Sequence, residues 1–263
     1  MRLATWNVNS LGARLERVVE WLEMKAPDVL CMQETKQTDE AFPADAFFAL
    51  GYESAHHGDG RWNGVAIVSR VGLADPVGGF SAPEDEYGCR ILAATCAGVR
   101  VHSVYVPNGR SLDSEHYGYK LAWLARLATY LGPAFQSGDV AVCGDFNIAP
   151  DDRDVYDPSR YVGVTHTSAP ERAALQRLEA WGLSDAFRLI YQQDRLFTWW
   201  DYRAGDFHNH RGMRIDLVLV TAPLAASVSW ALIDRNARKG QQPSDHTPLI
   251  VDFDEAASAP APG

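Results

Sequence analysis

Polar side chains that can bind metals or move protons recur in this sequence at the ends of short apolar runs. Clusters of Asn, Asp, Glu or His end five such runs, at residues 6–9, 33–36, 144–147, 214–216 and 244–246. Polar groups that follow buried strands usually mark the rim of a sheet, where functional sites are built. A single Asp–Asn pair after a strand is an ordinary turn former, so it is the recurrence of the clusters that indicates a site.

Asp216 differs from the other acidic residues because it lies inside a strand-like run, residues 213–219. A buried carboxylate without a partner would be costly. We therefore expect Asp216 to have a partner in the folded protein, and a histidine is the obvious candidate.

Three carboxylates of these clusters, Glu34, Asp145 and Asp245, offer the hard oxygen ligands that Mg²⁺ prefers. Asn7 and Asn147 can add neutral oxygens or orient a water molecule. No cysteine joins the set, which argues against a structural zinc site.

One imidazole, that of His246, lies next to a candidate metal ligand. A metal, carboxylates, amides and one histidine together suit the hydrolysis of a phosphate ester, because the carboxylate orients water while His or Tyr moves protons. The sequence has neither a Gly-rich phosphate cradle followed by Lys-Ser/Thr nor a Gly-x-Ser-x-Gly nucleophile elbow. A two-carboxylate glycosidase stays open, although such an enzyme would not need this many amides.

Hydrophobic patterning predicts the elements that must position these residues. Apolar or β-rich runs predict strands at residues 3–8, 28–33, 65–69, 90–97, 99–106, 140–146, 215–220, 228–233 and 249–253. Helical periodicity predicts helices between Ser10 and Pro27, from Tyr117 to Leu131 and from Ser168 to Trp181. Many strands follow one another without a helix between them, which favours two packed sheets covered by a few helices over a doubly wound parallel sheet.

No internal repeat or linker-like segment divides the chain, so we expect one domain over residues 1–254 and a disordered tail over residues 255–263. The sequence is 46% hydrophobic and contains 8 Trp, 10 Tyr and 10 Phe, which excludes a disordered protein. No apolar run approaches the ~18–20 residues that cross a bilayer, so we expect no membrane association.

The four cysteines are expected to be reduced thiols, with Cys31 and Cys143 in the core, because free cysteine behaves as a small buried hydrophobe. No pair of them has the spacing of a zinc knuckle or a redox motif. The N-terminus leads straight into a strand-like run without a signal peptide, which predicts a cytoplasmic protein.

Seven segments carry a resemblance to a known family. Residues 5–10, 31–36, 64–70, 105–109, 144–150, 214–216 and 244–246 are similar, in order, to motifs of the exonuclease III family of apurinic/apyrimidinic endonucleases. The resemblance extends over residues 3 to 253. It implies a four-layer α/β sandwich in which two mainly antiparallel β-sheets pack face to face, helices flank them and the site lies at one edge.

The resemblance also implies a role for each matching position. Glu34 matches the principal metal ligand, with Asn7 beside it. Asp145 matches the residue that orients or deprotonates the attacking water, and Asn147 a residue that positions that water or the transition state. The implied metal set is Asn7, Glu34, Asp145, Asn147 and Asp245, and the implied ion is Mg²⁺, for which Mn²⁺ can substitute. The implied catalytic set is Tyr105, Asp145, Asn147, Asp216 and His246.

Within that catalytic set, His246 matches a phosphate-binding imidazole that Asp216 holds, and Tyr105 matches a tyrosine near the phosphate. A small apolar pocket made by Trp199, Met213 and Ile215 is expected to admit a flipped-out abasic sugar. The candidate substrate-binding residues are Trp62, Asn108, Arg110, Trp199, Arg203, Met213 and Ile215. Core packing stays open for Trp199 and for its neighbour Trp200, and a surface position stays open for Trp62 and Arg203.

The activity implied by the resemblance is that of a Mg²⁺-dependent DNA-repair nuclease. Such an enzyme hydrolyses the phosphodiester 5′ to abasic sites in duplex DNA, with 3′–5′ exonuclease and 3′-phosphodiesterase or phosphatase activity. Its partner would be double-stranded DNA with abasic sites or 3′ ends, and nothing demands more than a monomer. One alternative is a phosphodiesterase for RNA or a small phosphate ester. Another is an inactive DNA-binding module, which would not need the six polar residues Asn7, Glu34, Asp145, Asn147, Asp216 and His246.

The charge distribution refines this expectation. The formal net charge is −10, from 24 Lys and Arg against 34 Asp and Glu, which argues against a protein that coats nucleic acid by bulk positive charge. Residues 188–240 nevertheless carry eight basic and five acidic side chains. We therefore expect a local basic rim that contacts few phosphates, and a shallow salt dependence of DNA binding.

Overall fold

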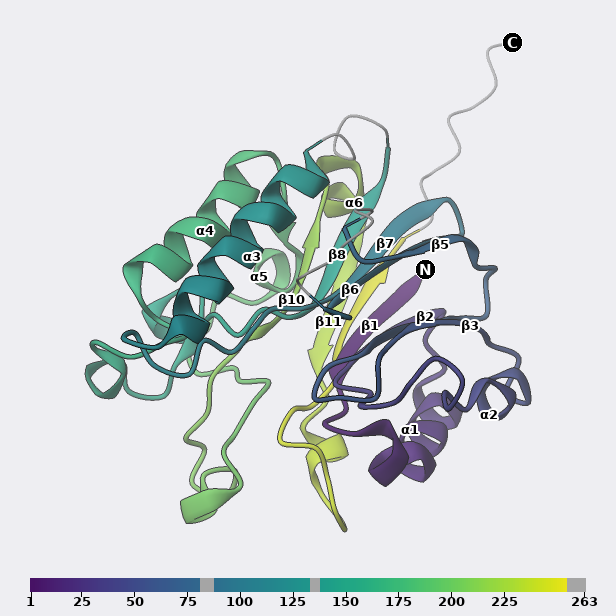
Figure 1. Cartoon of the computed structure of the whole chain (residues 1–263), viewed down its shortest axis with the longest axis horizontal. Coiled ribbons are helices and arrows are strands. Elements are labelled where there is room, and N and C mark those ends of the chain that lie inside the picture. Colours follow the sequence, from purple (N-terminus) through teal and green to yellow (C-terminus); the bar gives the residue numbers. More distant parts are fainter. Residues whose placement is uncertain (81–87, 133–137, 255–263) are drawn as a thin grey trace.

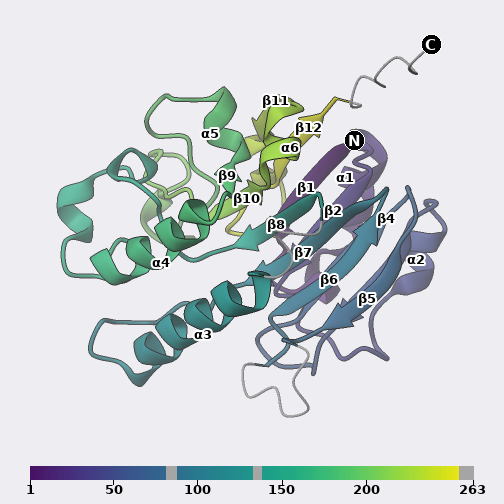
Figure 2. The ribbon, with the colours of Figure 1, turned by 90° about the horizontal axis from the view of Figure 1, so that it is seen from above.

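The computed structural model describes residues 1–80, 88–132 and 138–254. The predicted tail, residues 255–263, lies outside the described residues. Two six-stranded sheets pack face to face, and helices cover the outer face of each sheet (Figure 1). The view from above shows the resulting four layers, with α3 and α4 on one side and α1 and α2 on the other (Figure 2).

The first sheet has the strand order β11-β12-β1-β2-β4-β3. Its strands are β1 (Arg2–Asn7), β2 (Val29–Gln33), β3 (Glu53–His57), β4 (Val65–Ser69), β11 (Val228–Ile233) and β12 (Leu249–Phe253). The central pair β1 and β2 is parallel, and the other pairs are antiparallel. The first and last strands of the chain, β1 and β12, are therefore neighbours.

The second sheet has the order β5-β6-β7-β8-β10-β9 and the same internal plan. Its strands are β5 (Ala74–Gly78), β6 (Ile91–Cys96), β7 (Val99–Tyr105), β8 (Val140–Asp145), β9 (Ser184–Asp185) and β10 (Asp216–Val220). The central pair β7 and β8 is parallel, and the other pairs are antiparallel. Both sheets are thus mixed but mainly antiparallel, as expected.

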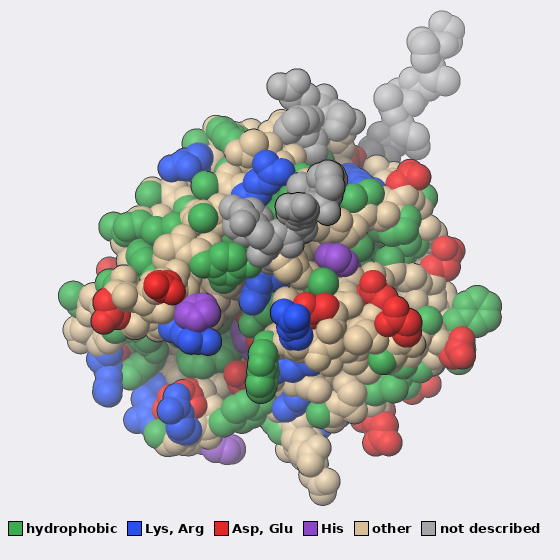
Figure 3. Space-filling model, viewed as in Figure 1, with side chains coloured by type: hydrophobic (Ala, Val, Ile, Leu, Met, Phe, Trp, Pro, Cys, Tyr) green, Lys and Arg blue, Asp and Glu red, His purple; other side chains and the backbone are tan. Residues whose placement is uncertain are grey.

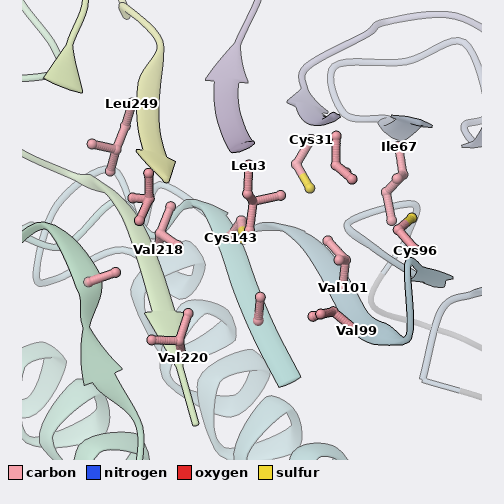
Figure 4. Packing of buried hydrophobic residues seen from close by; sticks show 14 of the residues in the cluster. Leu3, Cys31, Ile67, Cys96, Val99, Val101, Cys143, Val218, Val220 and Leu249 are labelled. Carbon is pink, nitrogen blue, oxygen red and sulfur yellow. The ribbon is translucent and has the colours of Figure 1, made fainter. Parts of the chain in front are cut away.

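The main core lies between the sheets, where alternate residues of each strand point inward. Leu3, Cys31 and Ile67 of the first sheet face Val101, Cys143 and Val218 of the second (Figure 4). Cys31, Cys96 and Cys143 are buried, and none of the four cysteines is in a disulfide. Several strands end in polar residues at one edge of the sandwich. The side chains that point between the sheets are therefore polar at this edge, and this is where the candidate site lies.

The remaining apolar side chains of the sheets pack against helices. α1 (Leu11–Lys25) and α2 (Ala44–Phe48) cover the first sheet, whereas α3 (Glu115–Leu131) and α4 (Ala169–Ala180) cover the second. α1 ends at Lys25, just before Pro27, as predicted. Ser168 and Glu171 form a capping box at the start of α4, and Ser168 is the residue at which this helix is predicted to begin. No helix within the described ranges is long and apolar enough to span a membrane.

All the predicted strands and the three predicted helices are present, with ends shifted by a few residues. Hydrophobic patterning missed β3, β5 and β9, together with α2, α5 (Ala186–Ile190) and α6 (Ala222–Ala226). These elements are short, and β3 and β5 are edge strands without buried side chains. They therefore show no apolar periodicity, and the neighbouring strand decides their conformation.

Candidate active site

The strand register places the site residues in one row. Tyr105 at the end of β7 pairs with Asp145 at the end of β8, and Asp145 pairs with Asp216 at the start of β10. Cys143, two residues before Asp145, faces the inter-sheet core, so Asp145 points into the same space at its edge. Asn7 ends β1 on the opposite sheet.

Asp145 is the centre of this arrangement and is 1% exposed. Its Oδ2 accepts hydrogen bonds from Nδ2 of Asn7 at 3.0 Å and from Nδ2 of Asn147 at 3.2 Å, and its Oδ1 accepts from the main-chain N–H of Asn147 at 2.9 Å. Burial raises the pKa of Asp145 to about 7, and Asp216 adds to the rise, while His246 and the amide donors oppose it. A carboxylate with this pKa can accept a proton near neutral pH.

His246 and Asp216 form a buried pair, with Nδ1 of His246 2.9 Å from Oδ2 of Asp216. The histidine partner expected for Asp216 is therefore confirmed. Nε2 of His246 lies 3.7 Å from Oδ2 of Asp145. Burial opposes the charged imidazole, but Asp216 and Asp145 outweigh it and raise the pKa of His246 to about 10. His246 therefore stays a cation at neutral pH.

Glu34 follows β2 and has a positive φ of 53°. Its Oε1 accepts from Nδ2 of Asn7 at 2.8 Å, and its Oε2 lies 2.9 Å from Nζ of Lys36. Asn7 thus links Glu34 on one sheet to Asp145 on the other. Asp245 lies beside this group and accepts from Nδ2 of Asn9 at 2.9 Å.

The carboxylates of Glu34, Asp145 and Asp216 are hard oxygen donors of the kind that Mg²⁺ prefers, whereas Asn7 and Asn147 turn their Nδ2 atoms toward Asp145. Asp145, Asp216 and His246 offer ligand atoms within 4.8 Å of one another. Oδ1 of Asp216 is buried and has no hydrogen-bond partner within the described part of the chain. This cluster differs from the expected metal set, Asn7, Glu34, Asp145, Asn147 and Asp245, in including Asp216 and His246.

Tyr105 is 9% exposed at the end of the row. Burial raises the pKa of Tyr105 well above its usual value, and the neighbouring carboxylates of Glu34 and Asp145 add to the rise. The guanidinium of Arg90, 4.7 Å from the ring centroid, opposes them. Tyr105 therefore remains a neutral O–H donor.

The side chains expected to form the apolar pocket pack as a separate cluster beside the polar row. Met213 and Ile215 are 3% and 2% exposed and pack with Ala149 and Val155, while Trp199 lies against them. Nε1 of Trp199 donates to Oδ2 of Asp245 at 3.0 Å, which ties the pocket to the site. Trp200 is fully buried, so of the two neighbouring tryptophans only Trp199 has surface near the site.

The other candidate DNA contacts lie around the site on the surface. Trp62 is 80% exposed, and the ammonium of Lys36 lies 5.5 Å from its ring centroid. Asn108 and Arg110 are exposed, and Nδ2 of Asn108 donates to Oδ1 of Asn147 at 3.2 Å. The Arg203 side chain is 87% exposed and pairs with Asp201.

The expected basic rim over residues 188–240 needs a correction. Arg188 and Arg214 are buried and pair with Asp154, and Arg214 also pairs with Asp185. Arg235 and Arg238 stack on aromatic rings of the same region. On the face of the molecule that Figure 3 shows, Lys and Arg side chains are interspersed with hydrophobic and acidic ones. A charge count over the sequence therefore overstates the positive surface, because it ignores internal partners.

Sequence reasoning missed His166. Its Nε2 lies 3.1 Å from Oδ1 of Asn147 and 3.2 Å from Nδ2 of Asn108. Burial and the nearby Lys120 lower the pKa of His166 to about 3, so the imidazole is neutral. His166 lies in an aperiodic loop with a φ of 78°, and neither feature leaves a signal in one sequence.

Comparison with known proteins agrees with this architecture. The endonuclease/exonuclease/phosphatase family matches residues 4–246. Exodeoxyribonuclease III of Haemophilus influenzae is 33% identical and spans 96% of this chain and 100% of its own length. An AP endonuclease from Archaeoglobus fulgidus superposes with a TM-score of 0.93 at 37% identity, over 97% of this chain and 100% of its own. The 3′ phosphatase NExo from Neisseria, solved with a product DNA hairpin, gives 0.94 at 39% identity, with coverage of 97% and 100%.

Proposed function

Because this chain belongs to the endonuclease/exonuclease/phosphatase family, in its exonuclease III-type branch, and is therefore a phosphodiester hydrolase, we propose that it is a Mg²⁺-dependent nuclease that repairs damaged duplex DNA. The observation that carries the proposal is the geometry around Asp145. Two amides orient this buried carboxylate, and the His246–Asp216 cation–anion pair lies beside it.

The residues of the row have distinct tasks in this proposal. Asp145 and Asn147 aim a water molecule at the phosphorus, and Asp145 receives its proton. The charged imidazole of His246 binds a phosphate oxygen, and Asp216 keeps the ring oriented. Tyr105 donates its O–H to another phosphate oxygen. The 3′ oxygen leaves on the side opposite the water, as in-line displacement requires.

The cation in this proposal is held by Glu34 and Asp145, with Asn7 between them. When bound, Mg²⁺ supplies positive charge that offsets the charge developing on the phosphate oxygens. The support for this assignment is that one amide, Nδ2 of Asn7, donates to both carboxylates and so brings them together. Mn²⁺ has similar ligand preferences and would substitute.

The proposal includes two DNA substrates. Cleavage 5′ to an abasic site requires the base-less sugar to enter the pocket of Trp199, Met213 and Ile215, and flipping costs least where no base is stacked. Removal of a 3′-terminal phosphate or nucleotide requires no flipping. The second activity is favoured by the similarity to the 3′ phosphatase from Neisseria. Trp62, Arg110 and Arg203 are the proposed DNA contacts in both cases.

A nicking assay tests the proposal. A duplex with one internal tetrahydrofuran abasic analogue and a nicked duplex with a 3′ phosphate are incubated with the protein in Mg²⁺ or in EDTA. We expect Mg²⁺-dependent cleavage of at least one substrate, and the ratio of the two rates assigns the main activity. Product from neither duplex in Mg²⁺, or equal product in EDTA, would contradict the proposed function.

A further inference from the structure

A buried ion pair lies directly behind the site, between α3 and α4. Lys120 of α3 and Glu171 in the first turn of α4 are both 0% exposed. Nζ of Lys120 lies 2.5 Å from Oε1 of Glu171. Lysine and glutamate are almost never fully buried unless they are paired. The sequence motifs include neither residue.

The remaining donors of Lys120 reach the two loops that carry the site amides. Nζ of Lys120 donates to the main-chain carbonyl of Asn147 at 2.7 Å and to that of Asn108 at 3.2 Å. An ammonium has three N–H donors. Glu171 and these two carbonyls therefore accept from all three N–H groups of Lys120. The loops after β7 and β8 are both hydrogen-bonded to Nζ of Lys120.

Glu171 also binds a third loop, which contains Thr165 and His166. Its Oε1 accepts from the main-chain N–H of His166 at 3.0 Å and from the hydroxyl of Thr165 at 2.7 Å. Its Oε2 accepts from the N–H and the hydroxyl of Ser168, at 3.0 and 2.6 Å, within the capping box of α4. The ion pair thus joins the loops of Asn108, Asn147 and His166.

The side chains of these three loops meet at Asn147. Oδ1 of Asn147 contacts Nδ2 of Asn108 and Nε2 of His166, while Nδ2 of Asn147 donates to Asp145. Asn147 and His166 have positive φ values of 51° and 78°. Such conformations are uncommon for residues other than glycine. The main-chain contacts of Lys120 and Glu171 therefore act on the same loops whose side chains meet at Asn147.

Gly109 shows how closely the first loop packs on the lysine stem. Its φ is 89°, and a Cβ at this position would lie 3.0 Å from Cδ of Lys120 and 3.0 Å from Oγ1 of Thr165. The loop therefore rests directly on the lysine stem.

Stability alone does not explain a charged pair at this place. Apolar residues of the same volume are often as stabilising as a buried ion pair. An apolar pair, however, could not bind two carbonyls and two N–H groups. We propose that Lys120, with Glu171 as its counter-ion, is a positioning residue that sets the place of Asn147 and Asn108 relative to Asp145; this inference rests on the proposed function.

Kinetics of three variants test the inference. Lys120→Met removes the contacts to both carbonyls. The double variant Lys120→Met/Glu171→Gln removes them too, without leaving the carboxylate of Glu171 buried and unpaired. Glutamine at position 171 also retains the capping box of α4. Arg188→Met is the control, because it also replaces a buried cation but does not contact the site amides. We expect kcat of the double variant to fall about 10–100-fold with KM nearly constant, because small misplacements of catalytic groups have effects of this size. The control should keep its kcat.

A double-mutant cycle separates positioning from general loss of structure. In an Asn147→Ala background, the amide that Lys120 positions is absent. The effect of Lys120→Met on kcat should then shrink to about twofold, because coupled residues are not additive. An equal loss in both backgrounds, or a folded double variant with unchanged kcat, would overturn the inference.

A spectroscopic readout does not depend on activity. Protein labelled with ¹⁵N-asparagine gives side-chain amide signals that Asn147→Ala and Asn108→Ala assign. Both signals should shift in the double variant and stay in place in Arg188→Met. Unmoved signals would overturn the positioning role, whereas a wild-type protein that cleaves no DNA would count against the proposed function instead.

Discussion

Two carboxylates, Asp145 and Asp154, lie nine positions apart in the chain and are equally buried, at 1% and 0% exposure. Burial raises the pKa of Asp145 to about 7, because the cation of His246 and the amides of Asn7 and Asn147 offset burial only in part and the carboxylate of Asp216 adds to the rise. Burial alone would also raise the pKa of Asp154, but the guanidinium groups of Arg214 and Arg188 outweigh it and lower that pKa. The partners, and not the depth, decide whether a buried carboxylate takes part in chemistry or in folding.

The largest expected effect comes from Asp145→Asn. Cleavage should fall by about 10²–10⁴-fold, the usual contribution of a positioned acid or base. DNA binding should stay within about tenfold, roughly 1.4 kcal/mol, because the surface contacts are unchanged. Single-turnover nicking and equilibrium binding on the same abasic duplex measure the two quantities. A variant that keeps most of its activity would show that another group prepares the water.

Asp154→Asn should give the opposite result. The change leaves the buried Arg188 without its carboxylate and Arg214 with Asp185 alone, and breaking a buried pair in this way costs about 3–5 kcal/mol. Urea unfolding at pH 7 measures the loss. Activity per folded molecule should be retained, and Arg188→Met should destabilise less, because Asp154 then keeps Arg214. The comparison fails if Asp154→Asn is as stable as the wild type.

The same pair predicts how stability depends on acid. The pKa of Asp154 is lowered in the folded state, so its contribution is present above the unfolded value of about 3.9 and is lost as the pH falls through the folded pKa. The unfolding free energies of the wild type and Asp154→Asn should therefore converge as the pH falls below about 4. A constant difference from pH 7 to pH 3 would assign the stabilisation to something other than this charge.

The smallest expected effect concerns salt. Several basic groups of residues 188–240 have internal partners, so few can release counterions from DNA. The slope of log K against log salt should be about −2 to −4, and Arg203→Gln should reduce its magnitude by about 1. Fluorescence anisotropy at several salt concentrations measures the slope. A slope near −8 would contradict this expectation, because it would require more exposed basic side chains than remain outside the internal ion pairs.

The sequence predicts the site best where chemistry coincides with strand ends. Asp145 follows from an apolar run that stops at polar residues, and Asp216 follows from a carboxylate inside a strand-like run. The sheet register then makes them neighbours. Their geometry needs the structure, because no pattern states which strands are adjacent. The sequence did not predict roles for Lys120 and His166. Lys120 is a polar residue on a helix, and His166 lies in a loop without hydrophobic periodicity.

Charge was the least informative property of the sequence. Arg188 and Arg214 were counted in the expected basic rim, yet both are buried. A composition records the sign of a side chain but not its partner, and only the fold brings Asp154 and Asp185 to these two arginines. Short edge strands such as β3 were missed for a related reason, because their pairing and not their own apolar content determines them.

The pairing of β1 with β12 has a consequence for the time at which the site first exists. The N-terminal amine donates to the carbonyl of Phe253 at 2.7 Å, and the hydroxyl of Ser244 donates to the carbonyl of Asn7 at 2.7 Å. Asn7 leaves the ribosome long before His246, because it precedes His246 by most of this domain. A nascent chain without residues 246–253 therefore has Asn7 but lacks His246 and β12, so its active site is incomplete. The site becomes complete only when β12 pairs with β1.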